Sequence, residues 1–305
     1  MKIIKSKFKK LADFCYELFG EAGLMIHKSK FSNRLYTQYQ HLFMLVYKQF
    51  RKFTYKELLE DLSDNLTLRA YLGLNKLPNY TTLIKFAKRI PSKIFDKLMD
   101  AFGKFIKQPE KVAIDGTGIS LDNPSPHYCK RIGQPYKKRP FLKLSVIVDI
   151  KDYLILQFKI RKKARHDVID AEPLIKKLAK KYKPIYFYGD RGYDSEKIFK
   201  LVFEELGAYP LILQKRLDIP KYKRRGRYRK ETFEVFDYGE YLQRNKVETA
   251  FSILKRKFGF SIRSKNVKNQ KVEAMARIIA YNIDRLLEMG KQVILIFIRF
   301  TRVSY

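Results

Sequence analysis

The sequence contains few of the residues that build disulfide scaffolds or zinc sites. Only 2 cysteines, Cys15 and Cys129, occur among 305 residues, and neither stands in a Cys-x2-Cys pair or a comparable zinc spacing. A disulfide-stabilised fold is therefore excluded, and reduced thiols in a cytoplasm are expected.

Long hydrophobic runs are also missing. Apolar runs such as residues 293–298 are far shorter than the roughly 20 residues that span a bilayer. Residues 1–14 intersperse charges among apolar side chains and contain no hydrophobic core of a signal peptide. We therefore expect a soluble protein with no membrane partner.

Negative charge is scarce relative to positive charge. The chain has 65 Lys and Arg against 31 Asp and Glu, a formal net charge of +34, yet 46% of its residues are hydrophobic. So much apolar sequence excludes a disordered basic tail and indicates a folded protein whose partner is a polyanion. Nucleic acid is the leading candidate, and an anionic membrane surface is the alternative.

Residues 6–108 show no strand-like alternation. Helical apolar spacing recurs in four segments, namely residues 11–19, 42–50, 55–62 and 95–106. After Pro78 and Asn79, Thr81 or Thr82 can cap a further helix. That helix carries Lys85, Lys88 and Arg89. It either contacts DNA in a helix-turn-helix or belongs to a small bundle with its cations in solvent. We predict an all-α N-terminal domain over residues 1–108, with a role in DNA-end binding or dimerisation.

The pattern changes after Gln108 and Pro109. The expected elements are a strand 112–114 ending in Asp115, strands 143–150 and 154–160, a helix 164–182 capped by Asp167 with Asp170 in a capping-box-like arrangement, a strand 185–190 ending in Asp190, a helix 195–206 ended by Gly207, and a strand 209–214. This order predicts an α/β domain of the RNase H-like type, a mixed sheet with flanking helices, over residues 109–305.

A basic segment, residues 215–231, follows the last of these strands. Seven of the ten residues from Lys221 to Lys230 are Lys or Arg, interrupted by Tyr222 and Tyr228. The segment is either a solvated loop or a loop that follows DNA phosphates, and the net charge favours the second. The candidate DNA contacts are Lys221, Lys223, Arg224, Arg225, Arg227 and Arg229.

Residues 241–260 show an uninterrupted helical pattern with no Gly or Pro before Gly259. Tyr241, Arg244, Glu248 and Lys255 fall on one face of that expected helix, within an arc of about 60°. Such a stripe is ordinarily a solvated face. A carboxylate held among cations also suits metal-assisted chemistry on a phosphodiester.

The spacing Tyr-x2-Arg-x3-Glu-x6-Lys resembles the C-terminal signature of the DDE transposases of bacterial and archaeal insertion sequences. Residues 112–120 (VAIDGTGIS) and 186–196 (YFYGDRGYDSE) resemble the other two motifs of that family, in the same order. The resemblance implies that Asp115, Asp190 and Glu248 are the catalytic, metal-binding carboxylates. It also implies that Arg244 and Lys255 hold phosphates of the transposon end, and that Tyr241 positions a nucleotide or anchors the helix.

Carboxylates at the ends of strands and on an adjacent helix suit two Mg²⁺ ions, which prefer oxygen ligands and for which Mn²⁺ can substitute. Rival carboxylates exist in the same domain, namely Asp149, Asp152, Asp167, Asp170 and Asp194. Asp190 is preferred over Asp194, because a strand end is more rigid than a loop. The resemblance supports the same choice.

The expected activity is that of a transposase. It would bind the terminal inverted repeats of its element as double-stranded DNA, cleave a strand at each end and join the 3′ ends to target DNA. The resemblance implies a homodimer, acting at the nucleoid in the cytoplasm. The alternatives are a structure-specific nuclease of the same fold, and a domesticated DNA-binding protein without catalysis, against which the three retained carboxylates argue.

Overall fold

The chain divides into two structural units. The computed structural model describes residues 6–27, 34–121, 130–131, 133, 140–163, 165–215, 219–259 and 261–290. One unit comprises residues 1–105 and 279–305, and the other comprises residues 106–278.

The first unit is built from helices. These are α1 (Lys7–Glu21), α2 (Gln38–Arg51), α3 (Tyr55–Asp64), α4 (Leu66–Tyr71), α5 (Tyr80–Arg89) and α6 (Ser92–Ala101), with a 3-10 turn η1 (Phe102–Lys104) after α6. Local sequence sets their starts, since Thr37 and Thr54 form capping boxes with Gln40 and Glu57. The four helices expected from apolar spacing are confirmed.

The cap of α5 differs from the prediction. Asn79, and neither threonine, is the N-cap, and its side-chain oxygen accepts from the Thr81 amide at 3.0 Å and the Thr81 hydroxyl at 2.9 Å. Asparagine caps at least as well as threonine, and here it stands one residue before the helix begins. The threonine hydroxyl therefore donates to the cap.

The last helix, α13 (Val267–Glu288), contributes to both units. From Ile279 onward it belongs to the helical unit, where Ile283 and Leu286 are fully buried and Asp284 pairs with Lys7 of α1 at 3.4 Å. The division expected from the sequence kept all residues to 305 in the second domain. The roles assigned to the two domains stay predictions, and the C-terminal segment 292–305, expected as helix or edge strand, lies outside the described residues.

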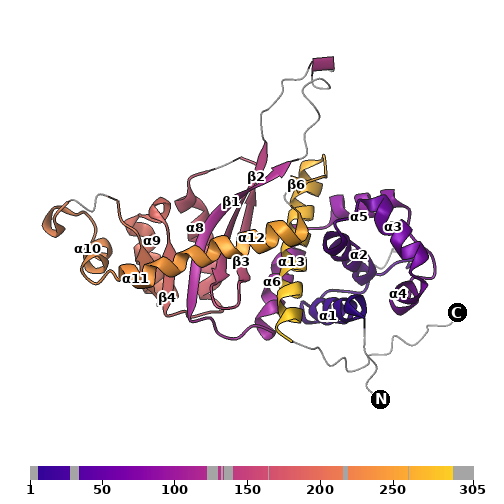
Figure 1. The fold of residues 1–305 in the computed structure, drawn as a ribbon, viewed down its shortest axis with the longest axis horizontal. Helices are drawn as coiled ribbons and strands as arrows, with labels where there is room; N and C mark the ends of the chain where they lie inside the picture. The colour runs from indigo at the N-terminus through magenta and orange to yellow at the C-terminus, as the bar shows by residue number, and fades with distance from the viewer. Residues whose placement is uncertain are drawn as a thin grey trace. The chain divides into compact units, whose positions relative to one another are not determined.

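The second unit is a mixed sheet with helices packed on it (Figure 1). The strands are β1 (Lys111–Leu121), β2 (Phe141–Asp149), β3 (Leu154–Arg161), β4 (Tyr186–Gly189), β5 (Tyr209–Ile212) and β6 (Ser261–Ile262). Their order is β3-β2-β1-β4-β5, with β6 paired to the end of β1. β2 pairs antiparallel with both β1 and β3, whereas β4 and β5 run parallel to β1. The predicted RNase H-like class, preceded by an all-α region, is confirmed.

Helices join β3 to β4 and β4 to β5. They are α8 (Asp167–Ala179) between β3 and β4, and α9 (Glu196–Leu201), continued by a π-helical turn η3 (Val202–Leu206), between β4 and β5. Gly207 ends the second with a φ of 70°, as the sequence predicts for a helix stop. The expected capping box at α8 is wrong, because His166 is the N-cap and the carboxylate of Asp167 is instead paired with Lys143 at 2.7 Å.

Strand β1 is longer than expected. Asp115 does not end it, because the strand continues to Leu121 and stays paired with β2 from Gly116 opposite Ser145 to Ser120 opposite Phe141. Gly116 and Gly118 lie inside this strand. A Cβ on Gly118 would stand 3.3 Å from the Phe141 ring. Asp190 does follow the end of β4, as expected.

The segments after β5 also differ from expectation. The basic segment is partly helical, with a 3-10 turn η4 (Lys221–Lys223) and helix α10 (Arg227–Glu234). The expected single helix over 241–260 is three consecutive pieces, α11 (Tyr238–Tyr241), the 3-10 segment η5 (Leu242–Asn245) and α12 (Lys246–Phe258). The arc calculated for an ideal α-helix therefore does not hold for Tyr241 and Arg244. No helix among the described residues is long and apolar enough to cross a membrane.

Candidate active site

Asp115 lies on β1, and Asp190 directly follows the neighbouring parallel strand β4. In the register of β1 and β4, Ala113 is opposite Tyr188, so two residues further along Asp115 comes opposite Asp190. Adjacent strands are about 4.8 Å apart, and residues at the same step of two strands point to the same face. The sheet thereby places the two carboxylates side by side. The backbone fixes each of them, since Asp115 accepts from the Gly116 amide at 2.7 Å and Asp190 from the Gly192 amide at 2.8 Å.

Arg244 connects Glu248 to this pair. Its guanidinium lies 3.6 Å from Asp115 Oδ2 and 3.3 Å from Glu248 Oε1. The contact arises because η5 packs near β4 and α12 packs on β1. Figure 1 shows α12 crossing the strands. The side chain of Glu248 is 63% exposed, whereas that of Asp115 is 19% exposed. Glu248 therefore reaches the site from its solvent side.

The surroundings of Asp115 make its charged form costly. Burial raises the pKa of this carboxyl to about 6, and the charges of Asp190 and Glu248 act in the same direction. The Gly116 amide and Arg244 oppose the rise. A pKa that is raised by burial and by two nearby carboxylates is common at functional positions.

A fourth carboxylate, Asp167 at the start of α8, borders the same space. A Cβ on Gly192 would lie 2.9 Å from Asp190 Oδ1 and 3.1 Å from Asp167 Oδ2, and a Cβ on Gly116 would lie 3.5 Å from Asp167 Oδ1. Gly192 thus makes room for these carboxylates, whereas a Cβ on Gly116 would make only an ordinary contact. The sequence ranked Asp167 only among the rivals, and no spacing in it could show that α8 begins beside Asp190.

The other two residues of the motif have different surroundings. Lys255 donates to the Thr117 hydroxyl of β1 at 2.7 Å, and burial lowers its pKa. Tyr241 is only 8% exposed and packs against the rings of Phe236 and Tyr238. Lys255 therefore attaches α12 to β1, while Tyr241 packs against rings of its own segment.

The candidate DNA contacts of the basic segment fall into two groups. Lys223, Arg225 and Arg227 are exposed, the last with Glu231 at 2.9 Å. Arg224 and Arg229 point inward instead. The first lies 3.5 Å over the Phe233 ring, and the second pairs with Asp194. The side chain of Lys221 lies outside the described part of the structure.

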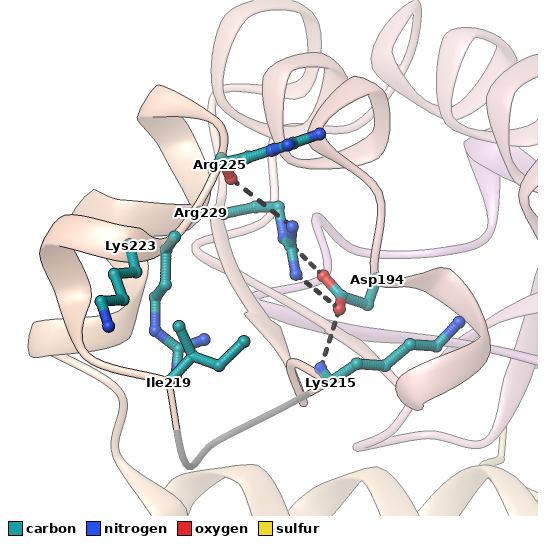
Figure 2. A pocket seen from close by; sticks show the side chains of 7 residues that line it. Asp194, Lys215, Ile219, Lys223, Arg225 and Arg229 are labelled. Carbon is teal, nitrogen blue, oxygen red and sulfur yellow. Dashed lines mark hydrogen bonds and ion pairs between the residues drawn. The ribbon is translucent and has the colours of Figure 1, made fainter.

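The inward residues help to line a cavity of about 620 Å³ (Figure 2). Its lining residues are Asp194, Lys215, Ile219, Lys223, Arg224, Arg225 and Arg229.

In the helical unit, the three cations predicted on α5, Lys85, Lys88 and Arg89, are all exposed on that helix.

The donor set fits a hard divalent cation. Among the described residues, no three Asp, Glu, His or Cys side chains are already gathered closely enough to hold a metal ion. However, the charges of Asp190 and Glu248 both act on Asp115, and Arg244 opposes them. Carboxylate oxygens are the ligands that Mg²⁺ prefers.

The site thus combines an aspartate on β1, a second aspartate directly after the neighbouring strand β4, and a glutamate on α12 that Arg244 links to the first. A family model described as "Transposase DDE domain" matches residues 106–283, and the chain belongs to this family. The resemblance in the motifs is thereby confirmed.

One solved structure found by comparison is the piggyBac transposase synaptic complex with hairpin DNA, determined by cryo-EM. The identity is 12% and the TM-score 0.47, with 93% of this chain and 74% of that chain covered. A search of curated proteins gives no match.

Proposed function

We propose that this transposase binds the terminal inverted repeats of an insertion sequence, hydrolyses a DNA strand at each end and joins the 3′ ends to target DNA. The observation that carries the proposal is the position of Arg244 between Asp115 and Glu248, with Asp190 beside Asp115 on the next strand. Family membership supports the same chemistry.

Asp115, Asp190 and Glu248 would hold the divalent ions, two Mg²⁺ or Mn²⁺ in their place. When bound, such ions activate a water or a DNA 3′-hydroxyl and stabilise the leaving oxygen. The protein side chains do the positioning. The sheet fixes the two aspartates rigidly, while the exposed Glu248 can adjust as substrate enters. Arg244 is close enough to the carboxylates to contact a phosphate held among them.

The net charge of +34 supports double-stranded DNA as the partner. The exposed Lys223, Arg225 and Arg227 would contact its phosphates, and α5 would supply further contacts through Lys85, Lys88 and Arg89. Joining two ends requires both to be held together, so we propose a homodimer that acts on DNA at the nucleoid in the cytoplasm.

Replacing Glu248 by glutamine tests this proposal. Glu248→Gln keeps the side-chain size but removes the charge that balances a cation. Strand nicking in Mg²⁺ should therefore fall on the order of 10³-fold or more, while binding to the terminal repeat in a gel-shift titration persists. Glu60→Gln on α3, at an exposed position of the helical unit, is the matched control and should nick normally.

Nicking by Glu248→Gln at a rate near that of the unmodified protein would remove Glu248 from the catalytic set. The same assay separates the alternatives. A structure-specific nuclease would cut branched DNA without joining ends, and a domesticated DNA-binding protein would bind without cutting in either variant.

A further inference from the structure

Asp194 is a buried anion at the base of the basic segment. Its side chain is 1% exposed, and Arg229 contacts it through Nε at 2.8 Å and through a terminal nitrogen at 2.8 Å. The Lys215 amide also donates to it at 2.8 Å. Figure 2 shows Arg229 and the Lys215 backbone converging on this carboxylate. Asp194 thus binds both the start of the segment and the first half of α10.

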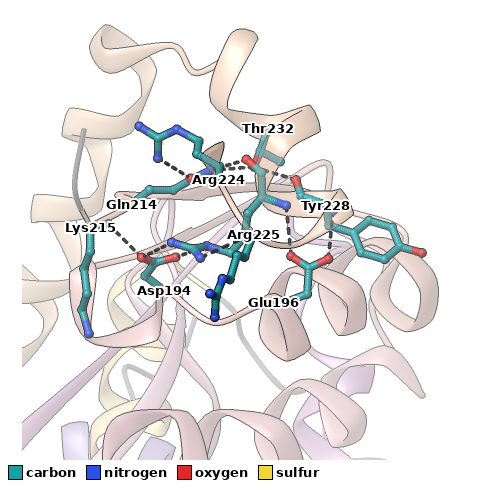
Figure 3. A network of polar contacts seen from close by, with 9 residues as sticks. Asp194, Glu196, Gln214, Lys215, Arg224, Arg225, Tyr228 and Thr232 are labelled. Carbon is teal, nitrogen blue, oxygen red and sulfur yellow. Dashed lines mark hydrogen bonds and ion pairs between the residues drawn. The ribbon is translucent and has the colours of Figure 1, made fainter. Parts of the chain in front are cut away.

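Glu196, at the start of α9, makes a second attachment. Its carboxylate accepts from the Tyr228 amide at 3.0 Å and the Arg229 amide at 3.2 Å, which are backbone donors in the first turn of α10 (Figure 3). A carboxylate at a helix N-terminus satisfies amides that have no partner within the helix. Gly226 permits this approach, because a Cβ there would stand 2.0 Å from Glu196 Oε2.

Gln214, just after β5, attaches the segment at a third place. Its amide nitrogen donates to the Arg229 carbonyl at 2.7 Å and to the Thr232 hydroxyl at 3.1 Å, and its oxygen accepts from Arg224 at 3.2 Å. These bonds are also drawn in Figure 3. Two of the segment's arginines are thereby used inside the protein.

This arrangement is unlike a solvated charge run. Such a run keeps its cations in water and needs no buried anion beneath it, because an unpaired buried charge is costly. Here Asp194, Glu196 and Gln214 hold one side of the segment. Lys223, Arg225 and Arg227 remain exposed on it.

We propose that Asp194 and Glu196 are positioning residues for DNA, which act through Arg229 and the start of α10 to hold the exposed cations of the basic segment in place. The inference rests on the proposed DNA-binding function. It also gives Asp194 a different task from Asp190, four residues earlier, since Asp194 faces the basic segment and Asp190 faces Asp115.

The test depends on the sign of a charge effect. Removing an acidic residue beside a DNA-binding surface should strengthen binding if only Coulomb attraction matters. Asp194→Asn should instead weaken binding, because the exposed cations lose their fixed position. Glu231→Gln is the matched control, because Glu231 is an exposed acidic residue of the same helix, and this substitution should leave affinity unchanged or raise it.

Affinity for a duplex carrying the terminal repeat is measured by fluorescence anisotropy across a salt series. Each DNA phosphate that the variant no longer neutralises should reduce the magnitude of the log-log salt slope by about 0.9 and lower affinity at 0.1 M salt roughly tenfold. Asp194→Asn should raise KM for DNA cleavage with little change in kcat. A collapse of kcat would make Asp194 a catalytic carboxylate and overturn the proposal.

A second variant leaves the charges unchanged. Gly226→Ala displaces Glu196 from the amides of α10, and it should reduce the salt slope as Asp194→Asn does. Amide hydrogen exchange should be faster at Tyr228 and Arg229 in both variants, whereas thermal unfolding confirms that the rest of the fold remains. Tighter DNA binding by Asp194→Asn, or an unchanged slope in either variant, would contradict the proposal.

The exchange measurement needs no DNA. If the unmodified protein fails to bind DNA, the proposed function fails, while the attachment of α10 by Glu196 is still tested by exchange alone.

Discussion

At the scale of single residues, glycines decide how closely the carboxylates approach the backbone. Gly192 is the tightest position at the acidic site, since a Cβ there would be 2.9 Å from Asp190 Oδ1 and 3.1 Å from Asp167 Oδ2. Neither carboxylate has much room to move, because the Asp190 oxygen is bonded to the Gly192 amide itself and Asp167 is paired with Lys143.

Gly192→Ala should therefore impair activity more than stability. Displacing Asp190 by a fraction of an ångström disturbs the geometry on which catalysis depends, and nicking should fall about 10²-fold. The nicking rate and the thermal unfolding midpoint are measured together. Gly20→Ala in α1 is the control, since its Cβ would meet nothing nearer than 3.9 Å, and it should stabilise the helix by about 0.5–1 kcal/mol. Full activity in Gly192→Ala would show that the close approach has no catalytic importance.

The sequence could identify Asp190 and Glu248 as candidates, because motif spacing and the type of each element can be read from the sequence alone. It could not show that Arg229 pairs with Asp194 or that Arg224 lies over Phe233, since both contacts depend on how α10 folds back on α9. A run of similar cations contains no signal that separates inward from outward side chains. Asp167 was ranked only as a rival, because its position near Asp190 depends on where α8 packs.

At the scale of elements, the helical unit contains a buried titratable contact between α2 and α5. His41 of α2 stacks on Phe86 of α5 with ring centroids 4.6 Å apart. Burial, with a smaller contribution from Arg89, lowers the pKa of His41 from 6.5 to about 4. Folding therefore requires the neutral imidazole.

The stability of the protein should consequently fall with acid. Between pH 6.5 and about 4 the unfolded chain binds a proton that the folded chain does not, so stability is complete above pH 6.5 and is lost as the pH falls. The loss should be about 2 kcal/mol at pH 5. Urea unfolding at pH 8 and pH 5 measures it. His41→Phe keeps an aromatic ring on Phe86, and between pH 8 and pH 5 it should lose about 2 kcal/mol less stability than the unmodified protein. An equal loss in both proteins would show that His41 does not cause the pH dependence.

Element boundaries were the weakest part of the sequence-based predictions, for a local reason in each case. The strand expected over residues 112–114 continues to Leu121, and inside it a Cβ on Gly118 would stand 3.3 Å from the Phe141 ring. The 3-10 turn of residues 242–245 has the composition of an α-helix. It packs near β4, and sequence periodicity does not report such a tertiary contact.

At the scale of the whole molecule, the chain combines a rigid acidic site with a strongly positive net charge. The sheet determines where Asp115 and Asp190 stand, and η5 and α12 bring Arg244 and Glu248 toward Asp115. The order of strands and helices was predictable because buried strands and amphipathic helices have distinct periods. The assignment of α13 to both units was not, because its apolar face is continuous along the sequence.

The central claim is that Asp115 and Glu248 act as one catalytic set with Asp190. The most direct measurement is the Mg²⁺-dependent nicking rate of Asp115→Asn, Glu248→Gln and the double variant on a terminal-repeat duplex. Residues that act as a unit are strongly non-additive, so each single variant should already fall to nearly the rate of the double variant. If the double variant instead loses the product of two separate effects, or if either single variant nicks normally, the two carboxylates do not share a site.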